Sequence, residues 1–279
     1  MGAELAINGV TIKRGELTIV RGVSLTCPEG QITVLLGANG AGKSTLMDAI
    51  AGVIPVEHGA ITLDGEEVQR LPRNRRAARG LAYVEQGRTV FAGLTVQDNL
   101  AVAARGARNT ARAYELFPEL ESRRQVTAQM LSGGEQQMLV LARAIVSQPR
   151  VLLIDEMSQG LAPVIVKRMV PFVQTAARSG IAVLLVEQFA SLALSIGAQA
   201  YVLSVGSIAL TGSCQDLLTR PDDVRRAYFS GEHDGSGGAP AAAAGQAPGP
   251  QDTGAQDTGA QDADTKNPAQ QAVKNGGSL

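Results

Sequence analysis

Apolar and polar residues alternate through residues 5–36, and turn signals interrupt the alternation at Arg14-Gly15 and Pro28-Glu29-Gly30. A period of two predicts strands, and the turns predict that the first strands are short and antiparallel. They lead into a mostly apolar run at 32–36. A second such run at 151–154 is typical of a parallel strand buried on both faces. The pattern therefore predicts antiparallel strands followed by a buried parallel sheet.

Helical spacing of apolar residues takes over between residues 95 and 145, where no strand pattern is present. We expect a helical subdomain over about residues 88–148. Farther along the chain helices and strands alternate, which favours an α/β fold. The expected elements there are a helix at 163–178, a strand at 181–187, a helix at 189–196, a hairpin at 200–211 and a last helix at 213–219.

Residues 37–45 fit the phosphate-binding loop pattern and lie between the apolar run at 32–36 and a predicted helix. In order they are Gly37, Ala38, Asn39, Gly40, Ala41, Gly42, Lys43, Ser44 and Thr45. The glycines allow backbone N–H groups to point at phosphate oxygens, and the helix dipole adds positive charge. We expect Lys43 to reach the β- and γ-phosphates, Ser44 to bind Mg²⁺ and Thr45 to add a phosphate contact. The complete pattern disfavours the alternative, a glycine-rich turn without a ligand.

Two acidic residues end the apolar run at 151–154. Asp155 is suited to bind Mg²⁺ through its water shell, and Glu156 is suited to accept a proton from an attacking water. The alternative is a solvated pair at a strand end. Because a phosphate loop is present in the same chain, we favour the catalytic interpretation.

Ser132, Gly133 and Gly134 open another predicted helix, whose apolar residues recur until Pro149 ends it. A helix N-terminus attracts anions, so this one could hold a second anion. Taken alone, Ser-Gly-Gly is an ordinary helix cap. The phosphate loop before it and the two acids after it favour the binding role.

Along the chain the phosphate loop comes first, the Ser-Gly-Gly motif second and the pair of acids third. With this order of motifs, the chain resembles the ATP-binding cassette (ABC) ATPases of membrane transporters over about residues 5–230. The resemblance implies a P-loop NTPase with an antiparallel β subdomain and an α-helical subdomain that carries the signature motif. It also implies ATP as substrate and Mg²⁺ as cofactor. In this family the signature, here 131–137, caps the γ-phosphate of ATP held by a second cassette. Ser132, Gly133 and Gly134 therefore imply a dimer.

The resemblance also implies roles for single residues. Gln86 would sense Mg²⁺ and the attacking water and relay to the permease, and residues 159–162 would cross to the partner cassette. Gln188 occupies the position of a usual His that contacts the γ-phosphate; because an amide carries no proton at neutral pH, we expect catalysis to rest on Glu156. Arg14 occupies the position of a common aromatic residue that stacks on adenine. Its guanidinium can stack on a base, and a solvated turn residue is an equal alternative.

Several segments narrow the resemblance to the ATPases of branched-chain amino acid importers. They are residues 84–91, 94–100, 115–118 and 158–163, together with the Glu187-Gln188 pair. Such systems imply a second cassette, two transmembrane permeases and an extracytoplasmic solute-binding protein, which place the chain at the cytoplasmic face of the membrane. Urea and short-amide importers share these segments. A soluble ABC ATPase of iron–sulfur assembly is a further alternative.

Composition agrees with a subunit that reaches the membrane only through partner chains. Apolar residues make up 44% of the chain, yet no run approaches the ~18–20 apolar residues that cross a bilayer, and no signal-peptide pattern opens the chain. Cys27, Cys214, His58 and His233 form no metal-ligand spacing, so we expect no zinc site. Two unpaired cysteines suit a reducing cytosol.

Five arginines form a basic cluster at residues 70–79. They are Arg70, Arg73, Arg75, Arg76 and Arg79. No aromatic residue for base stacking lies among them, and a single short cluster is typical of a solvated helix face. We therefore expect a solvated face and no nucleic-acid partner.

The stretch 231–279 differs from the rest of the chain. Gly, Ala, Pro, Gln and Asp dominate it, and Gln-Asp-Thr-Gly-Ala occurs twice in tandem from Gln251 to Ala260. Such a composition cannot bury enough apolar surface to offset the entropy of ordering. We expect an ATPase domain over residues 1–230 and a disordered tail over 231–279, which is either dispensable or regulatory.

Overall fold

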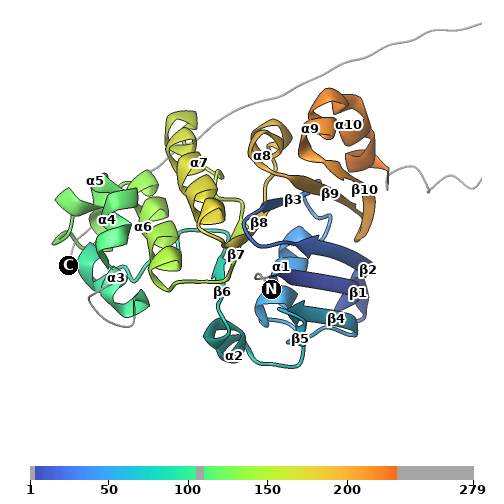
Figure 1. Ribbon diagram of the computed structural model, residues 1–279, viewed down its shortest axis with the longest axis horizontal. Coiled ribbons are helices and arrows are strands. Elements are labelled where there is room, and N and C mark those ends of the chain that lie inside the picture. Colours follow the sequence, from blue (N-terminus) through green and yellow to red (C-terminus); the bar gives the residue numbers. More distant parts are fainter. Residues whose placement is uncertain (1–3, 105–109, 231–279) are drawn as a thin grey trace, which may run out of the picture. The chain divides into compact units, whose positions relative to one another are not determined.

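Two β-sheets organise the part of the chain that the structure, a computed structural model, describes: residues 4–104 and 110–230 (Figure 1). The first sheet is antiparallel, with strand order β2-β1-β4-β5. Its strands are β1 (Leu5–Arg14), β2 (Leu17–Cys27), β4 (His58–Leu63) and β5 (Glu66–Glu67). In β1, Leu5, Ile7 and Ile12 are buried whereas Asn8 and Lys13 are exposed. The alternating residues therefore form antiparallel strands, as predicted, with one face of the sheet on the core. The prediction that the first strands are short is wrong, because β1 and β2 span 10 and 11 residues.

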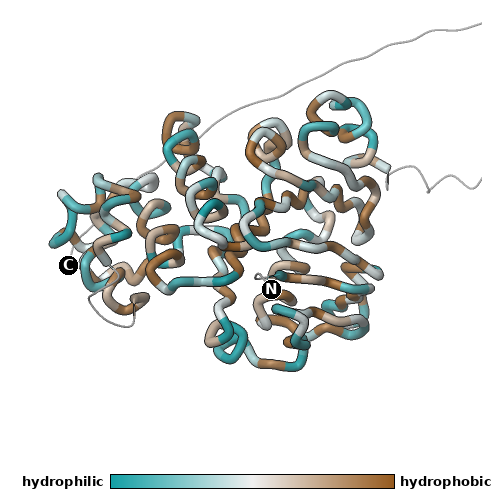
Figure 2. Tube along the Cα trace, in the orientation of Figure 1, coloured by the Kyte–Doolittle hydropathy of each residue, from teal (hydrophilic) through white to brown (hydrophobic). Residues whose placement is uncertain are grey.

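The second sheet has the order β10-β9-β3-β8-β7-β6. Its strands are β3 (Ile32–Leu36), β6 (Leu81–Val84), β7 (Val151–Asp155), β8 (Ala182–Val186), β9 (Gln199–Ser204) and β10 (Ser207–Ser213). Neighbouring strands are parallel except for the antiparallel pair of β9 and β10. Every residue of β3, β7 and β8 is buried, and Figure 2 shows hydrophobic segments where β7 and β8 lie. The apolar runs at 32–36 and 151–154 are thus buried strands, as predicted.

Helices cover both faces of the second sheet. They are α1 (Lys43–Ala51), α2 (Arg73–Ala78), α3 (Val96–Ala103), α4 (Thr110–Leu116), α5 (Pro118–Ser122), the 3₁₀ helix η2 (Ala128–Met130), α6 (Gly133–Val146), α7 (Pro163–Arg178), α8 (Ala190–Ile196), α9 (Cys214–Thr219) and α10 (Pro221–Phe229). In the described part of the chain, no helix is both long enough and apolar enough to span a membrane.

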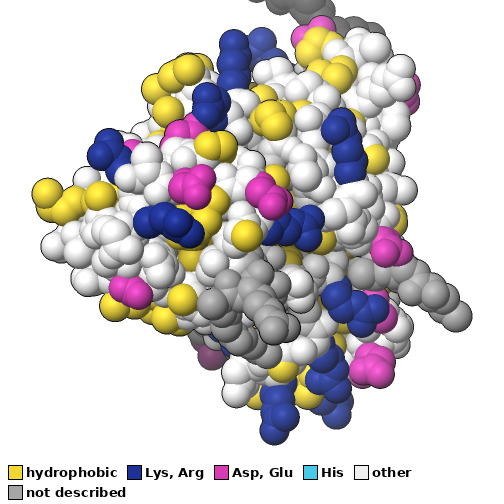
Figure 3. Space-filling view, turned by 60° about the vertical axis from the view of Figure 1, so that its left-hand side comes forward, with side chains coloured by type: hydrophobic (Ala, Val, Ile, Leu, Met, Phe, Trp, Pro, Cys, Tyr) yellow, Lys and Arg dark blue, Asp and Glu magenta, His cyan; other side chains and the backbone are white. Residues whose placement is uncertain are grey.

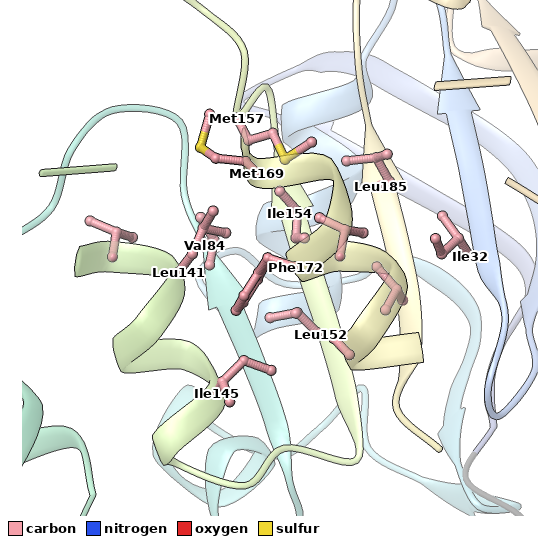
Figure 4. Packing of buried hydrophobic residues seen from close by; sticks show 14 of the residues in the cluster. Ile32, Val84, Leu141, Ile145, Leu152, Ile154, Met157, Met169, Phe172 and Leu185 are labelled. Carbon is pink, nitrogen blue, oxygen red and sulfur yellow. The ribbon is translucent and has the colours of Figure 1, made fainter. Parts of the chain in front are cut away.

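Alternation along the buried strands divides the core into two clusters. Leu153 of β7 shares one cluster with α1 and with the first sheet, so α1 lies between the two sheets. Leu152 and Ile154 point to the opposite face, where they share the second cluster with α6 and α7 (Figure 4). Met157, the second residue after β7, belongs to this cluster and is 1% exposed. The α/β fold class is therefore confirmed. The expected tail at 231–279 lies outside the described residues.

The two cysteines of the chain are free and fully buried, one in each cluster. Cys27 ends β2, and Cys214 begins α9. Burial raises the pKa of the Cys27 thiol to about 12 and that of the Cys214 thiol to about 11. These thiols act as small apolar side chains at neutral pH.

Arg76 corrects the expectation that the arginine cluster is a solvated face. Its side chain is 1% exposed, and its guanidinium donates hydrogen bonds to the carbonyl oxygens of Ala49 (2.5 Å), Ile50 (2.7 Å), Leu71 (2.9 Å) and Gln69 (2.8 Å). The last carbonyls of a helix lack partners within the helix, and a cation there also complements the dipole. Arg76 therefore caps the C-terminal end of α1. The other four arginines are exposed, and Figure 3 shows charges of both signs interspersed over one face of the molecule.

Arg76→Ala is expected to lower the free energy of unfolding by about 3 kcal/mol, because buried carbonyl oxygens lose their donor. Urea unfolding followed by circular dichroism measures this change. Arg75→Ala, in the same helix but exposed, is the matched control and should stay within about 0.5 kcal/mol of the wild type. Equal midpoints for the two variants would contradict the capping role.

Candidate active site

The phosphate loop, residues 37–45, joins the end of β3 to the start of α1. Gly42 directly precedes α1 with φ +105°, and a Cβ there would lie 3.3 Å from the carbonyl oxygen of Ile19, so the position favours glycine. Lys43 is 5% exposed, and its Nζ donates hydrogen bonds to the carbonyl oxygens of Gly37 (2.8 Å) and Ala38 (3.1 Å). The loop therefore wraps around the lysine.

A cavity of about 280 Å³ opens over this loop. Its walls are Ile19, Asn39, Gly40, Gly42, Lys43, Ser44, Thr45, Gln86, Glu156 and Gln159. Folding thus brings the phosphate loop together with Gln86 and Glu156, which lie in separate segments of the sequence. The lysine ammonium and the glutamate carboxylate line one open pocket, which suits an anionic substrate that reacts with water.

Glu156 is held from two sides. Its Oε1 lies 3.7 Å from Nζ of Lys43, and its Oε2 accepts a hydrogen bond of 2.9 Å from Nε2 of Gln86. The same Gln86 amide donates to Oε1 of Gln159 at 3.0 Å. Burial lowers the pKa of Lys43, while the charges of Glu156 and Asp155 oppose that shift. The carboxylate is therefore oriented into the cavity, where it can accept a proton.

Asp155 ends β7 and is 1% exposed. Neither carboxylate oxygen accepts a hydrogen bond within the described part of the chain. Burial raises the pKa of Asp155 to about 6, and the nearby Ser44 hydroxyl opposes the shift. A buried carboxylate without partners is costly, and a cation would satisfy it. Together, the Asp155 carboxylate and the Ser44 hydroxyl are oxygen ligands of the kind that Mg²⁺ prefers, so these residues fit that ion.

The signature residues form the start of α6. Ser132 caps the helix, since its hydroxyl accepts a hydrogen bond from the backbone N–H of Glu135 (3.3 Å) and the Glu135 carboxylate accepts one from the backbone N–H of Ser132 (2.8 Å). A Cβ on Gly133 would lie 2.7 Å from Nη1 of Arg88. Ser132, Gly133 and Gly134 are not among the residues that line the cavity over the phosphate loop of their own chain.

Two expected residues lie apart from the cavity. Gln188 follows β8 and is exposed, and it does not belong to the described lining. Arg14 ends β1, and its Nη2 forms a 2.7 Å ion pair with Oδ2 of Asp48 on α1. Arg14 is not in that lining either. The guanidinium that we expected near adenine is therefore engaged with α1 in this structure.

Ile19 and Gln159 line the cavity although sequence analysis gave them no such role. Ile19 lies within β2, and its carbonyl oxygen lies beside Gly42, since a Cβ on Gly42 would be 3.3 Å from it. That contact depends on how the first sheet packs on the loop, so no local sequence signal reveals it. Gln159 belongs to the predicted crossing loop; in the structure it also borders the cavity, where its Oε1 accepts a hydrogen bond from Gln86.

A family model and known transport proteins match this sequence. The sequence model of a family described as "ABC transporter" matches residues 20–159. The high-affinity branched-chain amino acid transport ATP-binding protein BraG of Pseudomonas aeruginosa is 40% identical over 233 residues, which are 81% of this chain and 100% of BraG. The probable branched-chain amino acid transport ATP-binding protein LivF of Archaeoglobus fulgidus is 37% identical over 213 residues, which are 73% of this chain and 89% of LivF.

The fold is also similar to that of a solved structure. The crystal structure of an ATP-binding cassette of an ABC transporter in its ADP conformation aligns with a TM-score of 0.73. The alignment covers 82% of this chain and 99% of that chain at 22% identity. The arrangement of both sheets and their helices is therefore that of a known nucleotide-binding fold.

Proposed function

The chain belongs to the ABC transporter family of ATP-binding proteins, and we propose that it is the subunit whose ATP hydrolysis energises an importer of branched-chain amino acids. The observation that supports hydrolysis most directly is the shared cavity of Lys43, Gln86 and Glu156. The proposed solute rests on the similarity to BraG and LivF. ATP is the substrate, and Mg²⁺ is the proposed cofactor.

We propose the following roles in hydrolysis. Lys43 turns from the carbonyl oxygens of its own loop to the β- and γ-phosphates, while the backbone N–H groups of residues 37–45 hold the phosphate oxygens. Glu156 accepts a proton from a water whose oxygen attacks the γ-phosphorus, and the bond to the bridging oxygen of ADP breaks. Gln86 orients that water beside Glu156. Ser44 and Asp155 would hold Mg²⁺, which when bound would supply positive charge beside the phosphates.

The catalytic unit that we propose is a dimer of cassettes. Ser132, Gly133 and Gly134 form a helix N-terminus suited to an anion, and within the described part of the chain they line no part of their own phosphate-loop cavity. They can therefore meet a γ-phosphate only if it is held by another chain. The partner cassette is either identical to this chain or a related one. In this dimer, the side chain of Gln188 would orient the γ-phosphate of the bound ATP.

A groove beside the site suits a permease partner. It has a volume of about 390 Å³ and includes Glu85, Phe91, Val140 and Arg143 in its walls. Phe91 is 45% exposed, and the Arg143 guanidinium lies 4.4 Å from its ring centroid. Glu85 directly precedes Gln86, so a cytoplasmic permease segment in this groove would act on the residue that holds Glu156. We propose that one permease docks in this groove on each cassette of the dimer, so that two permeases bring the chain to the cytoplasmic face of the membrane, with a solute-binding protein on the opposite side.

Capture and reconstitution test this function. We expect the tagged chain to extract two permeases from detergent-solubilised membranes, and the complex in vesicles to import radiolabelled leucine only with MgATP and the solute-binding protein. Urea is the comparison solute. Import of urea without leucine would reassign the solute to the short-amide class, and failure of the tagged chain to extract any membrane protein would overturn the transporter role.

A further inference from the structure

Glu187 is a buried carboxylate that takes no part in the hydrolysis scheme above. It follows β8 and is 0% exposed. Its Oε1 accepts a hydrogen bond from the backbone N–H of Ser158 (3.2 Å), and its Oε2 accepts one from the Ser158 hydroxyl (2.6 Å). A carboxylate removed from water is costly unless it is bonded. Burial raises the pKa of Glu187, and its bonds to Ser158 oppose that shift. Both donors of Ser158 are thus committed to Glu187.

The loop that Ser158 belongs to starts in a strained conformation. Glu156, its first residue, has φ +47°, in the left-handed region that residues with side chains rarely adopt. Such a conformation costs on the order of 1–3 kcal/mol and persists only where the surroundings fix it. The backbone N–H of Glu156 donates to the carbonyl oxygen of Val186 (2.9 Å), and that of Gln159 donates to the carbonyl oxygen of Glu156 (3.2 Å). The two bonds from Ser158 to Glu187 complete this attachment to the end of β8.

The same loop carries the contacts that orient the proposed base. Ser158 is followed by Gln159, whose Oε1 shares the Gln86 amide with the Glu156 carboxylate. If Ser158 were released, the backbone of Glu156 could relax toward a common conformation, and the carboxylate would turn away from the cavity. A displacement of about 1 Å at a reacting group can cost on the order of 10²-fold in rate.

We propose that Glu187 is a positioning residue, which fixes the loop 156–160 through Ser158 and thereby aims the Glu156 carboxylate at the attacking water. The inference rests on the proposed ATP hydrolysis. Glu187 acts through Ser158 and contacts no substrate. It therefore affects the rate of the chemical step and leaves the binding of ATP unchanged, because Ser158 and the Glu187 side chain make no hydrogen bond with residues 37–45 in the described part of the chain.

A double-mutant cycle tests the link. Glu187→Gln keeps the shape, but its amide nitrogen accepts no hydrogen bond, so one donor of Ser158 loses its partner. Ser158→Ala removes the hydroxyl and keeps the backbone N–H. Each change is expected to lower the ATPase kcat by about tenfold, and the double variant by about the same factor, since both break one interaction. The Kd for ATP, measured in the same preparations by calorimetry, should stay within about twofold.

Ser179→Ala is the matched control. Its hydroxyl donates to the carbonyl oxygen of Ala176 (2.8 Å) next to the end of α7, away from the loop, so kcat should not change. Single-variant kcat values within about twofold of the wild type, or losses that multiply in the double variant, would overturn the positioning role. If Glu187→Gln does not fold, the rate of Ser158→Ala decides. A wild-type chain that fails to hydrolyse ATP would overturn the proposed function and this inference with it.

Discussion

Glu156→Gln is expected to lower the ATPase kcat by at least ~100-fold, because a general base contributes that much or more and an amide is too weak a base to accept the proton. ATP binding should persist. Gln has the same shape as Glu, and the residues of the phosphate loop remain in place. The trapped ATP should then hold two cassettes together, so the variant should elute as a stable dimer with MgATP in size-exclusion chromatography. Single-turnover hydrolysis measures the rate.

Glu115→Gln on α4 is the matched control, since Glu115 is exposed and distant in sequence from both acids. It should keep the wild-type rate. Turnover of Glu156→Gln within a few fold of the wild type would assign the base to another group. If Glu156→Gln hydrolysed ATP at the normal rate and still dimerised with ATP, the dimer would not depend on blocked hydrolysis.

Lys43→Ala is expected to weaken MgATP binding by about 100-fold or more, because charge-assisted hydrogen bonds to two phosphates are lost. Lys43 contributes the buried ammonium of the cavity, so no neighbouring side chain of that lining replaces its charge. Isothermal calorimetry with MgATP measures the change in Kd. The melting temperature must be recorded as well, because the carbonyl oxygens of Gly37 and Ala38 lose their donor.

Lys13→Ala provides the control for this prediction. Lys13 is an exposed lysine on β1, and its Nζ lies 3.3 Å from Oε1 of Glu57. Its loss should leave the Kd for MgATP unchanged, because such surface pairs contribute little. Equal affinities of the wild type and Lys43→Ala would refute the assignment of residues 37–45 as the phosphate loop.

The fold class, the family and the ATPase activity could be predicted from the sequence because each depends on short-range signals. The glycines and lysine at 37–45 mark a strand, a loop and a helix in one segment, and the apolar run at 151–154 marks a buried strand. The helix at 163–178 was also predicted from its spacing and is observed over the same range as α7. These signals do not require knowledge of distant contacts.

Arg76, Arg14 and Ile19 show what such signals miss. The sequence around Arg76 indicates only a basic cluster. Two of the carbonyl oxygens that accept its hydrogen bonds lie 26 and 27 residues earlier, at the end of α1. Arg14 reaches Asp48 across 34 residues, a pairing that depends on α1 lying beneath the first sheet. Ile19 reaches the cavity for the same reason. Side-chain partners chosen by packing cannot be deduced from spacing along the chain.

Because both natural cysteines are buried, a cysteine introduced on the surface of the chain can be labelled selectively. Cys27 and Cys214 stay protonated and inaccessible at neutral pH, so maleimide reagents should leave the native fold unlabelled. One cysteine introduced at Met130, a 73% exposed position just before the signature, would then carry a single spin label. In a symmetric dimer, the distance between two such labels would report how far apart the cassettes lie at each stage of the ATP cycle, without first removing any natural thiol.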